Sequence, residues 1–165
     1  MNAPFQNLVT ALREELEQYG AMLALLDRQQ ELIIQRASGE LLDNVASTNA
    51  QVSVIQVAQR VRTHQQGEVA QHLQLPATAS FTDLAQRLPE SFGVLIGALV
   101  AENNQCLMRI QRRARQNHLL LSRSVEMMQR LLGTLLATTQ TTLYQGDGKL
   151  ATAVTAGRPL CDACG

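Results

Sequence analysis

Apolar side chains recur at alternating spacings of three and four residues along the first part of the chain. This spacing lines one face of an α-helix, because a helix completes a turn in about 3.6 residues. The stripe consists of Phe5, Leu8, Leu12, Leu16, Tyr19, Leu23, Leu26, Ile33 and Ala37, with one interruption at Gln30. It predicts a helix over residues 4–37, roughly 50 Å long. A rod of this length must pack lengthwise against other helices.

A second helix is expected after Ser38 and Gly39, which offer a break in the chain. Its apolar stripe is weaker than the first and consists of Leu41, Val45, Thr48, Val52 and Ile55. The pattern predicts a helix over residues 40–72. Residues 60–74 are dominated by Gln, His and Arg, so we expect this end of the helix to fray toward Pro76.

Two further helices are expected in the second half of the chain. Ser80 and Asp83 have the spacing of a capping box, with Asp in place of Glu or Gln, and predict a short helix over residues 81–88. Pro89 suits the first turn of a new helix, where its missing N–H costs nothing. A stripe over residues 90–143 then predicts one long helix. Its positions are Phe92, Ile96, Leu99, Asn103, Cys106, Ile110, Asn117, Leu121, Met128, Leu131, Leu135 and Thr138.

These elements predict an all-α fold. The composition agrees, because the chain has 45% hydrophobic but only 3% aromatic residues and four prolines in 165 residues. We expect an antiparallel hairpin of two long helices plus a long third helix, forming one helical domain over residues 1–148. Residues 145–148 form a turn-like Gln-Gly-Asp-Gly string. The remaining residues, 149–165, lack periodicity and are expected to form a flexible tail.

The charge distribution argues against nucleic-acid binding, because the formal net charge is zero. Residues 1–40 carry three basic and six acidic groups, whereas residues 91–165 carry eight basic and four acidic groups. The densest basic cluster lies between Arg109 and Arg115 and lacks interleaved aromatic residues. We interpret the asymmetry as the solvated faces of two antiparallel helices, and a basic docking surface on the later helix is the alternative.

The chain has no pattern typical of secretion or membrane insertion. Its N-terminus reaches Arg13 and two glutamates before any apolar run could form the core of a signal peptide. The longest apolar run, residues 92–101, is about half the length that crosses a bilayer. Glutamates at positions 90 and 102 flank it. We therefore expect a cytoplasmic protein without membrane insertion.

Few residues offer metal chemistry. His64, Glu68 and His72 lie four residues apart on one predicted helix face, but a metal ion would need a further ligand from elsewhere. Cys161 and Cys164 have the Cys-x-x-Cys spacing of redox and zinc motifs, yet no second pair accompanies them. We expect no metal site, and the role of the cysteine pair stays open.

Catalytic motifs are also lacking in the sequence. No Ser or Cys stands in a strained turn beside a His, as nucleophilic catalysis would require. Residues 146–149, Gly-Asp-Gly-Lys, lack the glycine interval and the preceding strand of a phosphate-binding loop. Cys106 falls within the helical stripe and is expected to be a small core residue. The sequence therefore predicts a protein that acts by binding, without enzymatic activity and without a cofactor.

Two short motifs are more specific than helical periodicity. Residues 117–122 read Asn-His-Leu-Leu-Leu-Ser, and residues 143–148 read Leu-Tyr-Gln-Gly-Asp-Gly. Together with the Leu-rich N-terminal helical pair, they make the chain resemble the FlgN family of flagellar type III export chaperones from about Leu8 to Gly148. The resemblance implies cytosolic binding of the hook-filament junction proteins, prevention of their early assembly, and delivery to the export gate and its ATPase complex. It implies no cofactor.

The leucines of the third long helix indicate where cargo would bind. Leu131 with Leu135, and Leu132 with Leu136, place apolar groups on two sides of one helix, and only one side can face the core of the protein. The other side is expected to form a partner surface. The expected cargo-binding residues are Leu131, Leu132, Leu135, Leu136, Thr139 and Leu143. The alternative is a structural or scaffolding coiled-coil protein that forms a homo-oligomer, such as a homodimer, in which these leucines are enclosed.

Tyr144 ends the apolar pattern where Gly146 and Gly148 break the helix. In the FlgN family the tyrosine of this turn is associated with contact to the export gate, and Tyr144 is the matching position. The resemblance thus implies that Tyr144 docks the chaperone at the gate. The alternative is a ring that folds back onto Leu143 or Thr141 as a helix cap.

Overall fold

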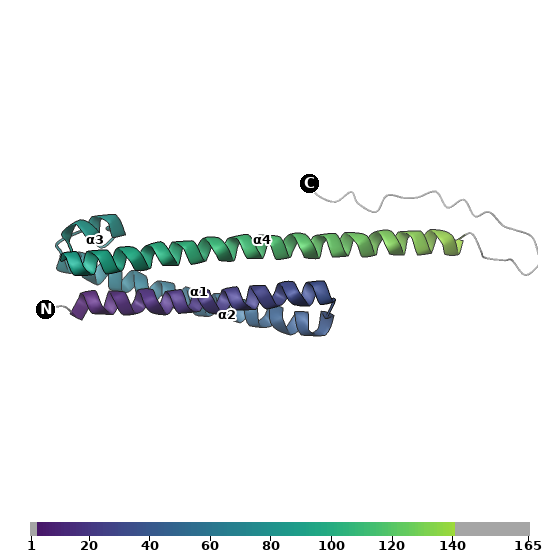
Figure 1. Ribbon diagram of the computed structural model, residues 1–165, viewed down its shortest axis with the longest axis horizontal. Coiled ribbons are helices and arrows are strands. Elements are labelled where there is room, and N and C mark those ends of the chain that lie inside the picture. Colours follow the sequence, from purple (N-terminus) through teal and green to yellow (C-terminus); the bar gives the residue numbers. More distant parts are fainter. Residues whose placement is uncertain (1–2, 141–165) are drawn as a thin grey trace, which may run out of the picture. The chain divides into compact units, whose positions relative to one another are not determined.

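The computed structural model describes the backbone of residues 3–140 and the side chains of residues 3–134. It contains four helices, α1 (Ala3–Gln35), α2 (Ser38–His72), α3 (Phe81–Arg87) and α4 (Glu90–Gln140), and no strand within the described residues (Figure 1). The predicted all-α fold, with two long helices followed by a longer one, is confirmed.

The chain divides into two compact units, residues 1–121 and residues 122–165, and α4 contributes to both. The predicted division into a helical domain over 1–148 and a tail over 149–165 stays a prediction, because residues 141–165 lie outside the described part of the chain.

The first unit is built on the hairpin of α1 and α2. The chain reverses at Arg36, whose φ of 57° lies in the left-handed region. Its amide donates to the carbonyl of Ile33 at 3.2 Å, and the amide of Ala37 donates to that of Leu32 at 3.1 Å, so two of the last four carbonyls of α1 have partners in the turn. The break therefore begins two residues before the Ser38 position at which the sequence predicted it.

The main apolar core gathers the N-terminal half of α1, the end of α2, α3 and the start of α4. Its fully buried members include Leu8, Val69, Leu84 and Ile96, one from each helix. The predicted end of this helix at residue 72 is confirmed, and the fraying expected toward Pro76 does not reach Val69 and Ala70, which are completely buried. Tertiary packing thus stabilises a stretch whose polar sequence favoured disorder.

The short helix α3 begins with the capping box that the sequence predicted. The amide of Asp83 donates to the Ser80 hydroxyl at 3.2 Å, and the Ser80 amide donates to the Asp83 carboxylate at 3.0 Å. Hydrogen bonds from the Ser80 side chain and backbone lower the pKa of Asp83, since they favour its charged form. The cap fixes where α3 starts and so delivers Leu84 to the core.

Within the first unit, α1 and α4 run parallel. The side-chain amide of Asn103 donates to the carbonyl of Leu12 at 3.0 Å, and Arg113 pairs with Asp27 at 2.6 Å, so later positions on α4 meet later positions on α1. The expectation that the acidic N-terminal and basic C-terminal stretches form antiparallel helices is therefore wrong. The connection through α2 and α3 returns the chain to the end at which it began.

A buried polar cluster joins α1 to α2 next to this core. Glu15 is only 3% exposed and lies 3.1 Å from the Nε of Arg62. Tyr19 donates its hydroxyl to the Glu15 carboxylate at 2.9 Å, and Gln59 donates to the Tyr19 oxygen at 2.8 Å. Burial raises the pKa of the Tyr19 hydroxyl above its usual value. The cluster holds the two helices at one relative position, because each polar group finds its partner only there.

Candidate partner-binding surface

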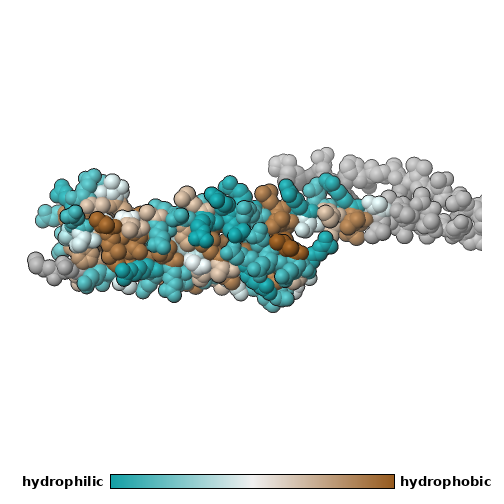
Figure 2. Space-filling view, in the orientation of Figure 1, coloured by the Kyte–Doolittle hydropathy of each residue, from teal (hydrophilic) through white to brown (hydrophobic). Residues whose placement is uncertain are grey.

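The second unit carries exposed apolar side chains along its described helical part. Large apolar groups are more than half exposed at five positions between residues 122 and 134, and Met128 reaches 67%. In the space-filling view, hydrophobic residues lie at the surface between hydrophilic ones (Figure 2). The apolar surface of α4, as we name it, consists of Val125, Met127, Met128, Leu131 and Leu132.

These five residues lie on one broad side of the helix. With about 100° between successive residues, Val125, Met128 and Leu132 follow one line along the helix. Met127 and Leu131 form a neighbouring line. Glu126 and Arg130 occupy the opposite side, where they form an ion pair at 2.6 Å. The segment is therefore amphipathic, and its apolar side is the exposed one.

The structure corrects one part of the sequence prediction. Leu131 and Leu132 lie on neighbouring lines of the helix, about 100° apart, and one of the two was expected to face the core. Both are exposed, at 58% and 57%. The exposed apolar surface is therefore wider than expected, because it includes both leucines and the side chain of Met128.

The remaining predicted site residues cannot be placed on this surface. Leu135, Leu136 and Thr139 belong to α4, but their side chains lie outside the described part of the structure. Leu143 and Tyr144 lie outside the described residues altogether. The assignments of these five residues stay predictions.

Sequence reasoning missed two members of the surface, Val125 and Met127. Neither falls on the long stripe that runs along α4, which passes through Met128 and Leu131 instead. The sequence does contain a signal for them, which is the width of the apolar part of the helix surface. A helix that packs along a single stripe does not need large apolar residues about 100° around the helix from that stripe.

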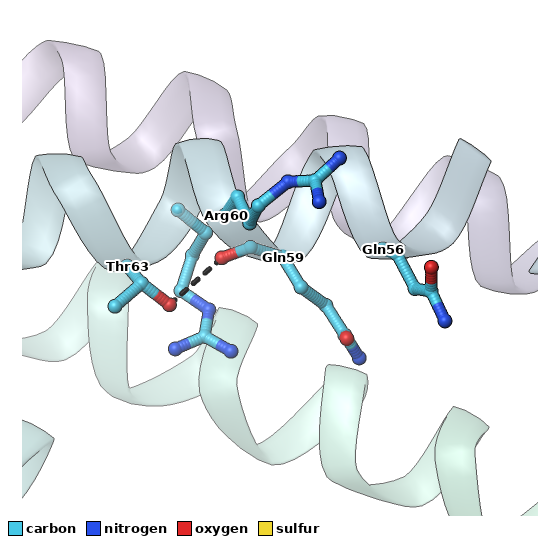
Figure 3. Close-up of a pocket in the computed structure, with 5 residues that line it drawn as sticks. Gln56, Gln59, Arg60 and Thr63 are labelled. Atoms are coloured by element: carbon cyan, nitrogen blue, oxygen red, sulfur yellow. Dashed lines mark hydrogen bonds between the residues drawn. The ribbon is translucent and has the colours of Figure 1, made fainter. Parts of the chain in front are cut away.

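A second surface feature is a hollow of about 470 Å³ on α2 (Figure 3). The labelled side chains Gln56, Gln59, Arg60 and Thr63 come from this one helix, and Arg62 completes the lining. The Thr63 hydroxyl is held by the carbonyl of Gln59 at 2.8 Å. None of the lining residues is a carboxylate, imidazole or thiol, so the lining has no general acid or base that could activate the Thr63 hydroxyl.

His64 and His72, the two histidines of the candidate metal site, each contact a neighbouring side chain of the first unit. The Nε2 of His64 lies 4.0 Å from the carboxylate of Glu68, whereas the ring of His72 packs edge-on against Phe5 with centroids 5.6 Å apart. Within the described residues, no three His, Cys, Asp or Glu side chains are grouped to hold a metal ion. Residues 161 and 164, the cysteine pair, lie outside that part.

The third cysteine is a core residue, as predicted. Cys106 is 8% exposed on the face of α4 that packs in the first unit. Burial raises the pKa of its thiol, and the carboxylate of Glu102 acts in the same direction, whereas Arg109 opposes them. The thiol therefore stays protonated at neutral pH and is a poor nucleophile.

The comparisons with known proteins supply the family. The family model described as FlgN protein matches residues 1–152. The chain belongs to the FlgN family. Its members are flagellar export chaperones and not enzymes, in agreement with the predicted action by binding. Neither a curated protein nor a solved structure matches the chain.

The FlgN match covers all four helices and extends past Leu143 and Tyr144, but it ends before Cys161. The residues predicted to bind cargo and to dock at the gate thus fall within the family region. No helix in the described part of this FlgN-family chain has a stretch long and apolar enough to cross a membrane.

Proposed function

We propose that this FlgN-family chain acts in the cytoplasm and binds hook-filament junction proteins through the apolar surface of α4. The observation that supports this proposal is the row of five large apolar side chains, each more than half exposed, on one side of a helix. Apolar groups that gather in this way on a protein surface mark a partner site far more often than chance placement does.

The chemistry of the surface indicates the kind of partner segment. An amphipathic helix that presents apolar groups at spacings of three and four would lie lengthwise along α4 and exclude water from both. Burying one large apolar side chain contributes roughly 1.5–3 kcal/mol before the entropic cost of association is subtracted. Several such contacts are enough for a specific complex.

The two methionines fit a chaperone with more than one cargo. Met127 and Met128 have flexible, unbranched side chains with a polarisable sulfur, and they are 58% and 67% exposed. Such side chains adapt to partner surfaces of different shape. A surface made only of Val and Leu would discriminate more strongly between two junction proteins.

Premature assembly is prevented, in this proposal, because the cargo segment that α4 covers is no longer available to other subunits. Delivery requires a separate contact with the export gate and its ATPase complex. We assign that contact to Tyr144, on the resemblance of the turn at residues 143–148 to the family motif. A tyrosine suits docking because it combines a large apolar ring with a hydroxyl.

A pull-down with the full chain from the cytosol of its native cells, followed by mass spectrometry, tests the proposal. We expect junction proteins as the main captured species, with gate components at lower abundance. Light scattering on the purified chain with each junction protein gives the stoichiometry. A tight homo-oligomer that ignores every junction protein would instead support the scaffolding alternative.

A further inference from the structure

The exposed side of α2 has an unusual composition for a surface helix. Sixteen consecutive residues, 44–59, carry no charge, although most surface helices of soluble proteins are charged on the solvent side. The stripe at spacings of three and four that runs along this side is exposed at every position. We name it the outer stripe of α2, and it consists of Asp43, Ala46, Ala50, Val54, Val57, Val61, His64 and Glu68.

The outer stripe is apolar in its middle. Val54, Val57 and Val61 are 44%, 50% and 42% exposed, and alanines 46 and 50 precede them one turn at a time. The opposite side of α2 is the one that packs on α1, as shown by Asn44 and Arg62, which bond to α1 residues. Since α2 has apolar residues on both sides, its sequence fits a helix that packs against α1 on one side and against a second partner on the other.

We propose that the outer stripe of α2 is the contact surface of a homodimer, in which the α2 helices of two copies pack antiparallel around a two-fold axis near Val54. This inference goes beyond the cargo function proposed above and does not depend on it. Only the first unit of the chain is involved.

A second copy is the occupant that the charges favour. A two-fold interface brings the same patch of both subunits together, so a charged patch would repel itself, whereas the uncharged middle of this stripe does not. By contrast, the solvent side of α1 carries charges such as Arg13, Glu14 and Glu17, which would oppose such a pairing.

The order of side chains along the stripe fits this antiparallel pairing. When the axis lies between positions 53 and 54, Ala50 faces Val57 of the second copy and Ala46 faces Val61 of the second copy. A small residue then meets a larger one at each level, which lets the side chains interdigitate and the helix axes approach closely. A parallel pairing would instead place valine against valine and alanine against alanine.

The ends of the stripe carry a carboxylate and an imidazole, which can form a hydrogen bond with each other. In the same arrangement, Asp43 of one copy faces His64 of the other, and the two-fold axis repeats this pair at the far end. The carboxylate of Asp43 has no hydrogen bond or ion pair within the described residues, and the imidazole of His64 is 69% exposed. The Asp43 carboxylate is therefore available for a contact between subunits, whereas His64 would exchange its long contacts with Glu68 at 4.0 Å and Gln65 at 3.4 Å for it.

The contact is one helix wide and about 32 Å long, from position 43 to position 64. It lies at the small end of specific interfaces, below about 1,200 Å². We therefore expect a reversible dimer with micromolar affinity, visible only over a range of protein concentrations.

Sedimentation velocity of the full chain across such a range tests the proposal, and Val52 offers a matched control. Val52 and Val54 are the same residue type on the same helix with equal exposure, 43% and 44%, but they point to different sides. Val54→Asp should weaken the dimer by at least about tenfold, whereas Val52→Asp should leave it unchanged. Circular dichroism confirms that both variants keep their helix content.

Disulfide trapping tests the pairing even if an aspartate variant fails to fold. With Cys161 and Cys164 replaced by Ser, Val54→Cys should form a dimer under mild oxidation, because the two sulfurs meet near the axis. Val61→Cys alone should not, since its copies lie roughly 22 Å apart along the helices, beyond the reach of a disulfide. Mixing Val61→Cys with Ala46→Cys should restore the link.

Three results would overturn the proposal. One is a wild-type chain that stays monomeric up to its solubility limit. Another is a dimer that Val52→Asp and Val54→Asp weaken equally. The third is trapping at position 61 alone but not at position 54. Each result leaves the cargo proposal intact, because binding of junction proteins is measured separately.

Discussion

Asn103 and Asn117 make the same contact with α1 at two levels of the first unit. They lie fourteen residues apart, and each donates its side-chain amide to the carbonyl of the residue 91 positions earlier, Leu12 at 3.0 Å and Leu26 at 2.8 Å. Fourteen residues are two heptads on both helices, so the two bonds fix how far α4 is displaced along α1. A one-turn slip would break both bonds at once.

The two buried asparagines lower the stability of the fold, and this cost predicts the effect of replacing them. Asn103 and Asn117 are 6% and 1% exposed, and the side-chain oxygen of each lacks a hydrogen-bond partner within the described residues. Leu has nearly the same size without an unpaired polar atom. The amide of Asn103 donates only to the helical carbonyls of Leu12 and Leu99, whereas the amide of Asn117 also donates to the buried side-chain oxygen of Gln29 at 2.9 Å. We therefore expect Asn103→Leu to raise the free energy of unfolding by about 1 kcal/mol in urea denaturation.

Asn104→Leu is the matched control, because Asn104 is the exposed neighbour of Asn103 and should change stability by less than about 0.5 kcal/mol. We also expect the double variant Asn103→Leu with Asn117→Leu to lose its single defined pairing of α1 with α4, visible as extra or broadened amide signals in NMR spectra. An Asn103→Leu variant that is less stable than the wild type would contradict the assigned cost of the unpaired Asn103 oxygen.

The buried pair of Glu15 and Arg62 gives a second stability prediction with the opposite sign. The Glu15 side chain is 4% exposed and that of Arg62 is 23% exposed. Arg62→Met leaves the carboxylate buried without its cation and should lower the free energy of unfolding by about 3 kcal/mol. Chemical denaturation at neutral pH measures this change.

A double variant separates the pair from the rest of the cluster. Glu15→Gln together with Arg62→Met removes both charges, and it should recover much of the stability lost in Arg62→Met alone. Glu14→Gln, on an exposed position of the same helix, serves as the control. If Arg62→Met were as stable as the wild type, Glu15 would have another source of stabilisation.

The hairpin and the long helix could be predicted from the sequence because local periodicity determines which stretches are helical. The side of each helix that packs in the core could not be predicted exactly. The stripe inferred for the first helix uses Leu16 and Leu23, whereas the structure buries Glu15 and Met22 at the corresponding turns. A glutamate is rarely buried unless it is paired. Its partner Arg62 lies 47 residues away, which no local pattern reveals.

The candidate site shows the same limit. The sequence identified the leucines at positions 131 and 132 as a two-sided apolar pair, since helical geometry follows directly from spacing. Whether each side is covered depends on the presence of other helices at that level, and periodicity carries no information about them. The exposure of both sides, together with Val125 and Met127, appears only in the folded chain.

The apolar surface of α4 predicts how cargo binding responds to truncation. Met128→Ala with Leu132→Ala removes two neighbouring apolar groups and should weaken junction-protein binding about thirtyfold, equivalent to about 2 kcal/mol. The melting temperature should change little, because both side chains are more than half exposed. Isothermal titration calorimetry and thermal unfolding measure the two quantities.

Leu119→Ala is the control for this experiment, because Leu119 is an exposed leucine of α4 that lies in the first unit and outside the apolar surface. It should bind cargo like the wild type. Adding Leu136→Ala to the double variant tests the predicted extension of the surface and should weaken binding further. Cargo binding that withstands all of these changes would place the capture site elsewhere in the chain.

Tyr144 gives the prediction that separates delivery from capture. We expect Tyr144→Ala to leave thermal stability and junction-protein affinity nearly unchanged, while it reduces export of junction proteins and motility in cells. The reason is that docking needs the ring and hydroxyl together, whereas capture is assigned to the apolar groups of α4. Tyr144→Phe keeps the ring and tests the hydroxyl alone, so its export should lie between that of the wild type and that of Tyr144→Ala. Normal export by Tyr144→Ala would exclude the docking role, and loss of cargo affinity in vitro would assign Tyr144 to the capture surface.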